Sequence, residues 1–182
     1  MITRIVKVLK INSRTRGPVN QELYVKGNIV VTEEIDIALK SLLLSESEIR
    51  LVRSDRAELL FHELLEYFVE GGDSGDRRWW WESFSQPSKY VQFHDDMGFK
   101  RISNIVPDVN ESVWFVVEDD QLPFYPIYET TPEVIQKVIG ECYGFEYYII
   151  PKSKEWLLCE NHHGNLIGLG KTIINKLVQY DT

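Results

Sequence analysis

The fold is most readily predicted from residues 145–170, which read FEYYIIPKSKEWLLCENHHGNLIGLG. Three apolar runs follow one another here, FEYYIIP, EWLLCENHH and GNLIGLG, and only the tripeptide KSK separates the first two. Runs of this length that are rich in β-branched and aromatic residues are typical of strands. Short connections join antiparallel neighbours, whereas parallel strands need a long crossover. The stretch therefore predicts three consecutive antiparallel strands.

Further strands and helices are predicted on either side of this stretch. VWFVVED, which begins at Val113, is strand-like and can pair with FYPIYE, which begins at Phe124, through the turn DDQLP. Residues 131–143 predict a helix, because a threonine can cap it, Pro132 suits its first turn and apolar residues recur at helical spacing. TIINKLVQY, at residues 172–180, predicts a closing helix.

The N-terminal half is predicted to be mainly helical. One helix is expected from Thr32, and a second near Ser54, where apolar residues form a single stripe. The opening segment, ITRIVKVLKIN, fits neither the helical nor the strand period, so both remain open. Glycines in GGDSGD, at residues 71–76, interrupt the chain and predict a flexible loop.

These elements predict a single α+β domain spanning residues 1–182. We expect a helical N-terminal part (1–70), the loop (71–76) and a sheet-rich C-terminal part (77–182). The C-terminal half should form a mostly antiparallel sheet, packed against helices from the N-terminal half and against the 131–143 helix.

The charge distribution limits the possible partners. The net charge is −8, with +5 on residues 1–21 and −13 on the remainder. An acidic body argues against nucleic acid, because phosphate binding needs clustered lysine and arginine. No apolar run is long enough to span a bilayer, and no export signal is recognisable, so we expect a cytoplasmic protein without membrane contact. The oligomeric state stays open.

The adjacent histidines His162 and His163 raise the question of a metal site. In a regular strand their side chains would point to opposite faces, and Glu160 would share a face with His162 only. A zinc site usually needs three or four protein ligands, which this set does not supply. The alternative is that Asn161 and one histidine satisfy backbone groups at a strand end and turn. No glycine-rich phosphate cradle or nucleophile elbow is present either, so no cofactor is expected.

RRWWWESF, at residues 77–84, is the least ordinary segment. Three consecutive tryptophans cannot enter one core from an extended chain, because Trp80 would face away from Trp79 and Trp81. Either all three rings are buried between helices and sheet, or at least one is exposed as a binding anchor beside Arg77 and Arg78, since tryptophan and arginine are frequent at interface hot spots.

The acidic run Glu118, Asp119 and Asp120 is a second candidate interaction surface. It follows the strong strand that begins at Val113. Three acids at a turn normally favour solubility, but they can also steer a basic partner towards the protein.

The motifs WWWESF, IVPD, SVWFVVED, ECYGFEYYII and EWLLCENHHGNLIG together resemble an uncharacterised bacterial family, known only as a domain of unknown function among small acidic proteins. The resemblance covers roughly residues 77–170. It implies no activity, and no catalytic residue is transferred by it.

The leading functional prediction is a non-enzymatic module for protein–protein interaction, and more narrowly an immunity-type protein that neutralises a basic toxin. Two alternatives remain. One is a metal-assisted hydrolase that uses Glu160, His162 and His163, with Glu146 as a possible base. The other is a small-ligand binding domain whose pocket Tyr147, Tyr148 and the tryptophans would line.

Overall fold

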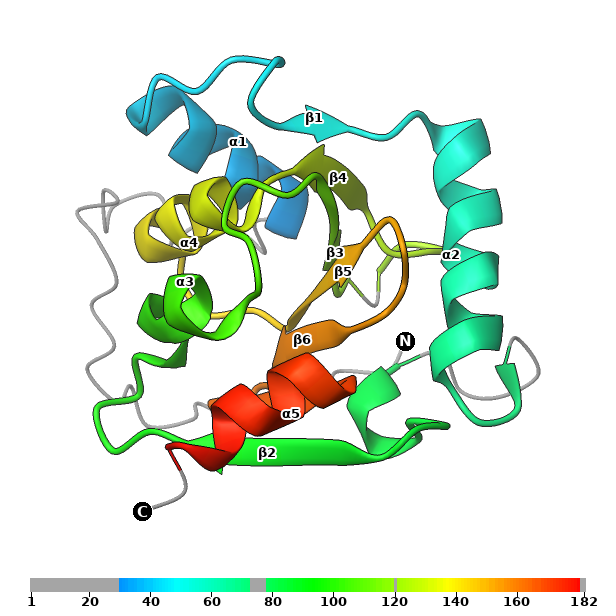
Figure 1. Ribbon diagram of the computed structural model, residues 1–182. Coiled ribbons are helices and arrows are strands. Elements are labelled where there is room, and N and C mark those ends of the chain that lie inside the picture. Colours follow the sequence, from blue (N-terminus) through cyan, green and yellow to red (C-terminus); the bar gives the residue numbers. More distant parts are fainter. Residues whose placement is uncertain (1–29, 73–77, 120, 181–182) are drawn as a thin grey trace, which may run out of the picture.

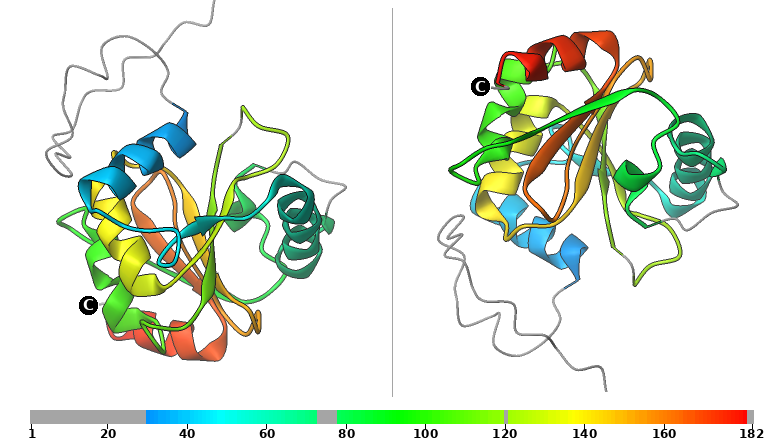
Figure 2. Two further views of the ribbon diagram at one scale, coloured as in Figure 1. Left: turned by 90° about the horizontal axis from the view of Figure 1, so that it is seen from above. Right: turned by 90° about the horizontal axis from the view of Figure 1, so that it is seen from below.

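The computed structural model describes residues 30–72, 78–119 and 121–180. A single sheet runs through the middle of the molecule, with helices on both faces (Figures 1 and 2). The helices are α1 (Val31–Ser41), α2 (Ser54–Phe68), α3 (Ile102–Ile105), α4 (Pro132–Glu141) and α5 (Lys171–Val178), with short 3₁₀ helices η2 (Trp80–Glu82) and η3 (Gly98–Arg101). The strands are β1 (Arg50–Leu51), β2 (Ser88–Gln92), β3 (Val113–Val117), β4 (Ile127–Thr130), β5 (Tyr147–Pro151), β6 (Leu157–Glu160) and β7 (Asn165–Leu169).

The seven strands lie in the order β1-β4-β3-β5-β6-β7-β2, and every neighbouring pair is antiparallel. The predicted α+β class and the antiparallel sheet of the C-terminal half are therefore confirmed. The hairpins β5–β6 and β6–β7 are the three-stranded unit that residues 145–170 predict. Thr131 caps α4 through its side chain, and Pro132 takes the first turn, as expected.

The sheet separates two hydrophobic clusters. On one face the core is closed by α1, α3, α4 and α5, while α2 and Trp80 cover the other face (Figure 2). Both faces of β3 and β5 are buried along their whole length, which explains why these segments read as continuous apolar runs rather than as alternating ones.

Two strands that the sequence does not reveal form the edges of the sheet. β1 consists of Arg50 and Leu51 and pairs with β4, and β2 pairs with β7. In β2 only Val91 is buried, so its alternation is too weak to be recognised from the sequence. β1 also attaches the N-terminal half directly to the sheet.

Helix α5 approaches the sheet closely because β7 carries a glycine there. A Cβ atom on Gly168 would lie 2.3 Å from the Cγ2 atom of Ile173 and 2.8 Å from the Cδ1 atom of Leu177. Both side chains are fully buried. The missing side chain is thus what lets α5 pack onto β7 and the neighbouring β2.

Parts of the predicted organisation fall outside the described residues. These are the segment 1–29, with its basic residues, and residues 73–77, which include most of the predicted loop 71–76.

Candidate functional site

The candidate site forms where the three central strands end. β3, β5 and β6 are adjacent and alternate in direction, so the end of β3, the start of β5 and the end of β6 meet at one margin of the sheet. Glu118 follows β3, Glu146 precedes β5, and His162 lies in the turn after β6. The backbone N–H of Glu118 donates to the carbonyl oxygen of Glu146 at 3.0 Å, which fixes the two residues side by side.

The two histidines lie close together, against the expectation from strand alternation. β6 ends at Glu160, and residues 161–164 form a turn in which the N–H of Gly164 donates to the carbonyl oxygen of Asn161 at 2.8 Å. The ring centroids of His162 and His163 are 4.0 Å apart. The expectation for a regular strand therefore does not apply, because these residues belong to a turn, where successive side chains need not alternate.

Asn161 organises that turn. Its Oδ1 atom accepts hydrogen bonds from the backbone N–H groups of His163 at 3.1 Å and Asn165 at 3.0 Å. The alternative interpretation from sequence, in which Asn161 satisfies backbone groups at a strand end, is confirmed for this side chain.

Glu146 is the central acceptor of the site. One carboxylate oxygen, Oε1, accepts from the backbone N–H of His162 at 2.7 Å and contacts the Nδ1 atom of the same imidazole. The other oxygen accepts from the indole N–H of Trp81 at 3.3 Å. Glu146 is buried, so this carboxylate anchors both the histidine turn and the tryptophan segment.

Glu118 lies beside Glu146 in a half-buried position. Burial and then the neighbouring Glu146 carboxyl raise the pKa of Glu118 from its ordinary value of 4.5 to about 8. The hydroxyl of Tyr148 donates to its Oε2 atom at 3.4 Å. Glu118 therefore carries a proton at neutral pH, in contact with a second carboxyl group.

Asp119 supplies a third carboxylate in an unusual state. The side chain is 4% exposed, and its Oδ1 atom accepts from the backbone N–H of Gln121 at 3.0 Å. The other oxygen, Oδ2, is buried and has no hydrogen-bond partner among the described residues. Buried polar atoms nearly always have partners, and an unpaired buried charge is costly, so this oxygen lacks the donor that such an atom normally has.

The tryptophan segment separates its three rings by backbone geometry. Trp79 adopts a left-handed conformation (φ 55°), and η2 begins at the next residue. Trp80 is fully buried, and its ring stacks on Tyr148 at 4.7 Å between centroids. Trp81 is half-buried, whereas Trp79 is 40% exposed. The prediction that all three rings are buried is therefore wrong, and Trp79 is the exposed ring of this segment.

The exposed ring contacts both a cation and the histidine turn. The Arg78 guanidinium carbon lies 5.5 Å from the centroid of the Trp79 ring. The imidazole of His162 lies 5.9 Å from Trp79 and 5.8 Å from Trp81, between ring centroids. Arg77 and Asp120, which belong to the predicted interaction surfaces, lie outside the described residues.

These groups line one open pocket of about 470 Å³. Most of its lining residues come from the two predicted interaction surfaces and the strand ends, and they are Val31, Arg78, Trp79, Glu118, Asp119, Gln121, Phe145, Glu146 and His162. The sequence identifies the charged and aromatic residues of this pocket separately, but it does not show that they line one pocket. It misses Gln121, Phe145 and Val31, for which the sequence contains no distinct signal.

Of the residues of the predicted metal site, His162 contacts both His163 and Glu146, but Glu160 lies apart from them. Glu160 is buried, and its Oε2 atom accepts from the hydroxyl of Tyr147 at 2.8 Å. It lies next to Gly98, on the face of the sheet that α3 and α4 cover. Glu146 contacts His162, whereas Glu160 contacts Tyr147. Among the described residues, no group of three or more histidine, cysteine, aspartate or glutamate side chains could hold a metal ion.

Other predicted ligand contacts are also absent from the pocket. Tyr147 and Tyr148 are fully buried and do not line it. Cys142 and Cys159 are buried and form no disulfide with each other. Within the described ranges, no helix has the length and apolar character needed to cross a membrane.

Comparisons with known proteins place the chain in a family without adding an activity. No curated protein and no solved structure gave a significant match. One family model, described as a family of unknown function (DUF6756), matches residues 29–181, a longer range than the resemblance seen in the sequence. The chain therefore belongs to the DUF6756 family of unknown function.

Proposed function

We propose that this protein is a non-enzymatic interaction module that binds a basic partner by taking one lysine or arginine side chain into the pocket beside Glu118, Asp119 and Glu146. The observation that carries the proposal is the unpaired, buried Oδ2 atom of Asp119. A guanidinium or ammonium group would supply the donor that this oxygen lacks, and charge-assisted hydrogen bonds of this kind are strong.

The aromatic lining of the pocket suits the same ligand. Trp79 and Phe145 provide apolar walls for the aliphatic stem of a long basic side chain. The π face of a tryptophan also attracts a cation, and Arg78 already lies over the Trp79 ring within the chain itself. Carboxylates and aromatic rings that line one pocket thus complement an arginine side chain.

Binding of a cation in this pocket should release a proton. Because the pKa of Glu118 is about 8, its carboxyl group is mostly neutral at lower pH. A cation pairs best with the ionised form, so the affinity should increase as the pH rises towards 8. This pH dependence of the affinity distinguishes insertion of a basic side chain into the pocket from general attraction to the acidic surface.

Among basic partners, we favour a toxin, with this protein as its immunity protein in the cytoplasm of a bacterium. The net charge of −8 supports this, because opposite charges accelerate the encounter of two proteins. Buried thiols at Cys142 and Cys159, which form no disulfide with each other, are compatible with a reducing compartment. A pulldown from the native host tests this narrower proposal: one specific basic protein should bind at low salt and be lost with Asp119→Asn.

The binding mode itself can be tested without the natural partner. The probe is a short arginine-rich peptide, and its control is the same peptide with citrulline in place of arginine, which keeps the shape and removes the charge. Titration followed by calorimetry should show binding of the arginine peptide only, with a heat that depends on the ionisation enthalpy of the buffer because a proton is released.

The matched control variant is Asp55→Asn, which removes the same charge at an exposed position on α2 that does not line the pocket. Asp119→Asn should abolish most of the binding, and Asp55→Asn should reduce it only slightly. Equal binding of the two peptides, or equal effects of the two variants, would contradict the proposal.

A further inference from the structure

Within the described residues, the outer edge of β2 is the longer of the two open edges of the sheet. β2 is the last strand in the sheet order and pairs with β7 on its inner side. Among the described residues, no strand pairs with its outer side. The opposite edge strand, β1, has two residues, whereas β2 has five. An edge of this length presents unpaired backbone N–H and C=O groups that a further strand can use.

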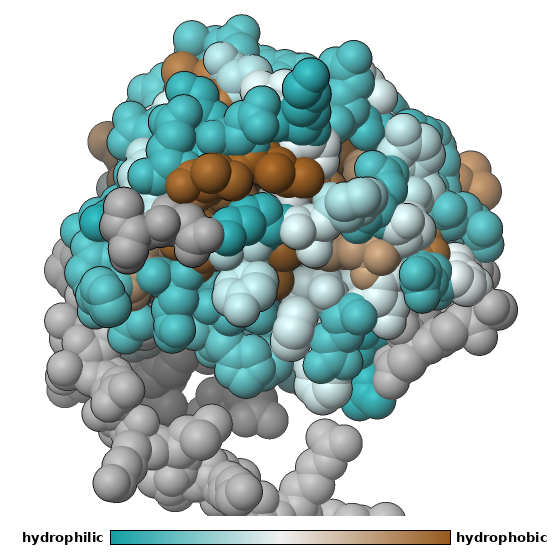
Figure 3. All heavy atoms as spheres, turned by 60° about the horizontal axis from the view of Figure 1, so that its bottom comes forward, coloured by the Kyte–Doolittle hydropathy of each residue, from teal (hydrophilic) through white to brown (hydrophobic). Residues whose placement is uncertain are grey.

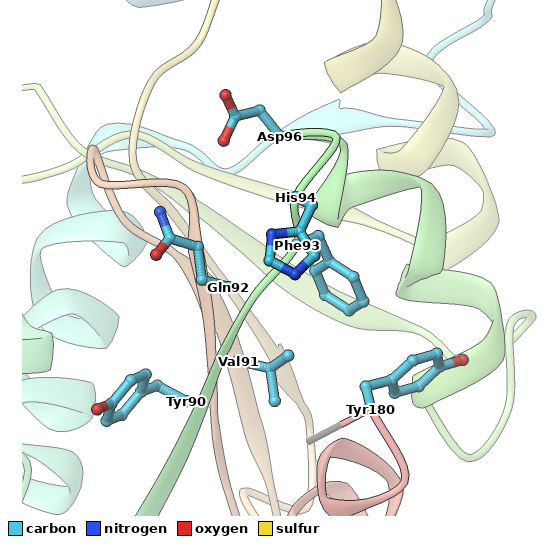
Figure 4. A pocket seen from close by; sticks show the side chains of 7 residues that line it. All are labelled: Tyr90, Val91, Gln92, Phe93, His94, Asp96 and Tyr180. Carbon is cyan, nitrogen blue, oxygen red and sulfur yellow. The ribbon is translucent and has the colours of Figure 1, made fainter. Parts of the chain in front are cut away.

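A groove follows this edge. It has a volume of about 410 Å³ and is lined by Tyr90, Val91, Gln92, Phe93, His94, Asp96 and Tyr180. Five of these residues are consecutive, and successive side chains of a strand point to opposite faces. Figure 4 shows this arrangement, with Tyr90 and Gln92 on one side of the ribbon and Val91 and Tyr180 on the other. The groove therefore runs along the backbone edge and does not lie on a single face.

The position of α5 determines how a second copy of the chain can pair with β2. α5 packs on both β7 and β2. Neighbouring strands are about 4.8 Å apart, so a second copy joined strand to strand at β2 would place its α5 two strand spacings away, or about 10 Å. Packed helices are separated by about 8–10 Å. The two helices would thus lie side by side on the same face of a continuous sheet.

Exposed apolar side chains occur on both faces of the edge. Tyr90, at the middle of β2, is 66% exposed on the face away from α5, and Val178, at the end of α5, is 54% exposed. Figure 3 looks towards this side of the molecule and shows an elongated hydrophobic strip within hydrophilic surface. Pairing of two copies would bring the two Tyr90 side chains together and place the two α5 helices, which carry Val178, side by side.

We propose that this edge is a homodimer interface, in which β2 pairs antiparallel with β2 of a second copy about a two-fold axis. Full overlap of the five-residue strands places the two Tyr90 side chains near the axis and pairs Ser88 of one copy with Gln92 of the other. A strand pair alone buries less than the roughly 800 Å² per partner of a stable interface, so a stable dimer also requires the contact between the two α5 helices. This geometry favours a second copy over an isolated peptide.

The experiment is the molar mass of the full chain in solution, measured by light scattering or sedimentation over a wide range of concentration. The wild type should shift from the 21.3 kDa of one chain towards twice that mass as its concentration rises. Tyr90→Glu should give a monomer, because two carboxylates would meet at the axis, and Val178→Glu should weaken the dimer. Leu59→Glu is the matched control, since Leu59 is 73% exposed on α2, and it should leave the dimer unchanged.

A second variant tests the register. Oxidation of Tyr90→Cys should produce a disulfide-linked dimer, with no background from the native cysteines because both are buried. Leu59→Cys should remain mostly unlinked. A wild type that stays monomeric at every concentration, or a dimer that resists both Tyr90→Glu and Val178→Glu, would overturn the proposal. Neither outcome depends on whether the pocket near Asp119 binds cations.

Discussion

One carboxylate oxygen of Glu146 contacts both the backbone N–H and the ring nitrogen Nδ1 of His162. This double contact ties the start of β5 to the turn after β6, at the margin where β3 also ends. It places His162 against Trp79 and Trp81, and it leaves Glu118 and Asp119 on the adjacent strand end as the acceptors that face the pocket.

Asp119→Asn should stabilise the protein while it impairs binding. The Oδ2 atom of Asp119 is buried without a partner among the described residues, so replacing the charged group by a neutral amide removes a desolvation penalty. An increase of about 1 kcal/mol in the free energy of unfolding is expected. Urea denaturation measures it. A variant less stable than wild type would indicate that this oxygen has a partner.

Stability should decrease as the pH rises from about 4.5 to about 8. The folded pKa of Glu118 lies above its ordinary value of 4.5, so over this range the unfolded chain releases the proton while the folded chain retains it. The contribution of Glu118 is complete below pH 4.5 and is lost by about pH 8. With allowance for solvent screening we expect a change on the order of 1–3 kcal/mol.

Glu118→Gln provides the control for this pH dependence. The neutral amide cannot release a proton, so the free energy of unfolding should change less between pH 5 and pH 8 than in the wild type. Urea denaturation at several pH values compares the two proteins. Parallel curves would show that Glu118 ionises in the folded protein as readily as in the unfolded chain.

Trp79 and Trp80 should differ sharply when each is replaced by alanine. Trp80 is fully buried and contacts Phe61, Tyr125 and Tyr148, so its loss should cost about 3–5 kcal/mol of stability. Trp79 is partly exposed, and its replacement should cost less than about 1 kcal/mol but weaken binding of the arginine peptide. Thermal unfolding and calorimetry separate the two effects.

Gly168→Ala should destabilise the packing of α5. The added Cβ atom would meet Ile173 at 2.3 Å, and overpacking of a core typically costs about 1–3 kcal/mol. Gly140→Ala, within α4, is the matched control. The added Cβ atom would lie 3.5 Å from a ring atom of Phe99, which is an ordinary contact distance. There alanine should be neutral or stabilising by up to about 1 kcal/mol. Comparable losses at both sites would argue against a specific close approach of α5.

The sequence alone was sufficient for the elements whose signals are local. The hairpins of residues 145–170 follow from short connections between apolar runs, and α4 follows from Thr131, Pro132 and an apolar stripe. β2 escaped prediction because one buried residue, Val91, produces no periodicity. Strand alternation does not predict the histidine turn, because β6 ends at Glu160.

Residue types and local periodicity thus determined the α+β class, the antiparallel hairpins and the acidic character of this protein. Tertiary structure decided which distant residues meet. Glu118 and Glu146 lie side by side at the ends of neighbouring strands because β3 and β5 pair, although β4 and α4 separate these strands in the sequence. No local rule specifies that pairing. The physical reason is that secondary structure depends on neighbours along the chain, whereas a pocket depends on the order in which strands pair.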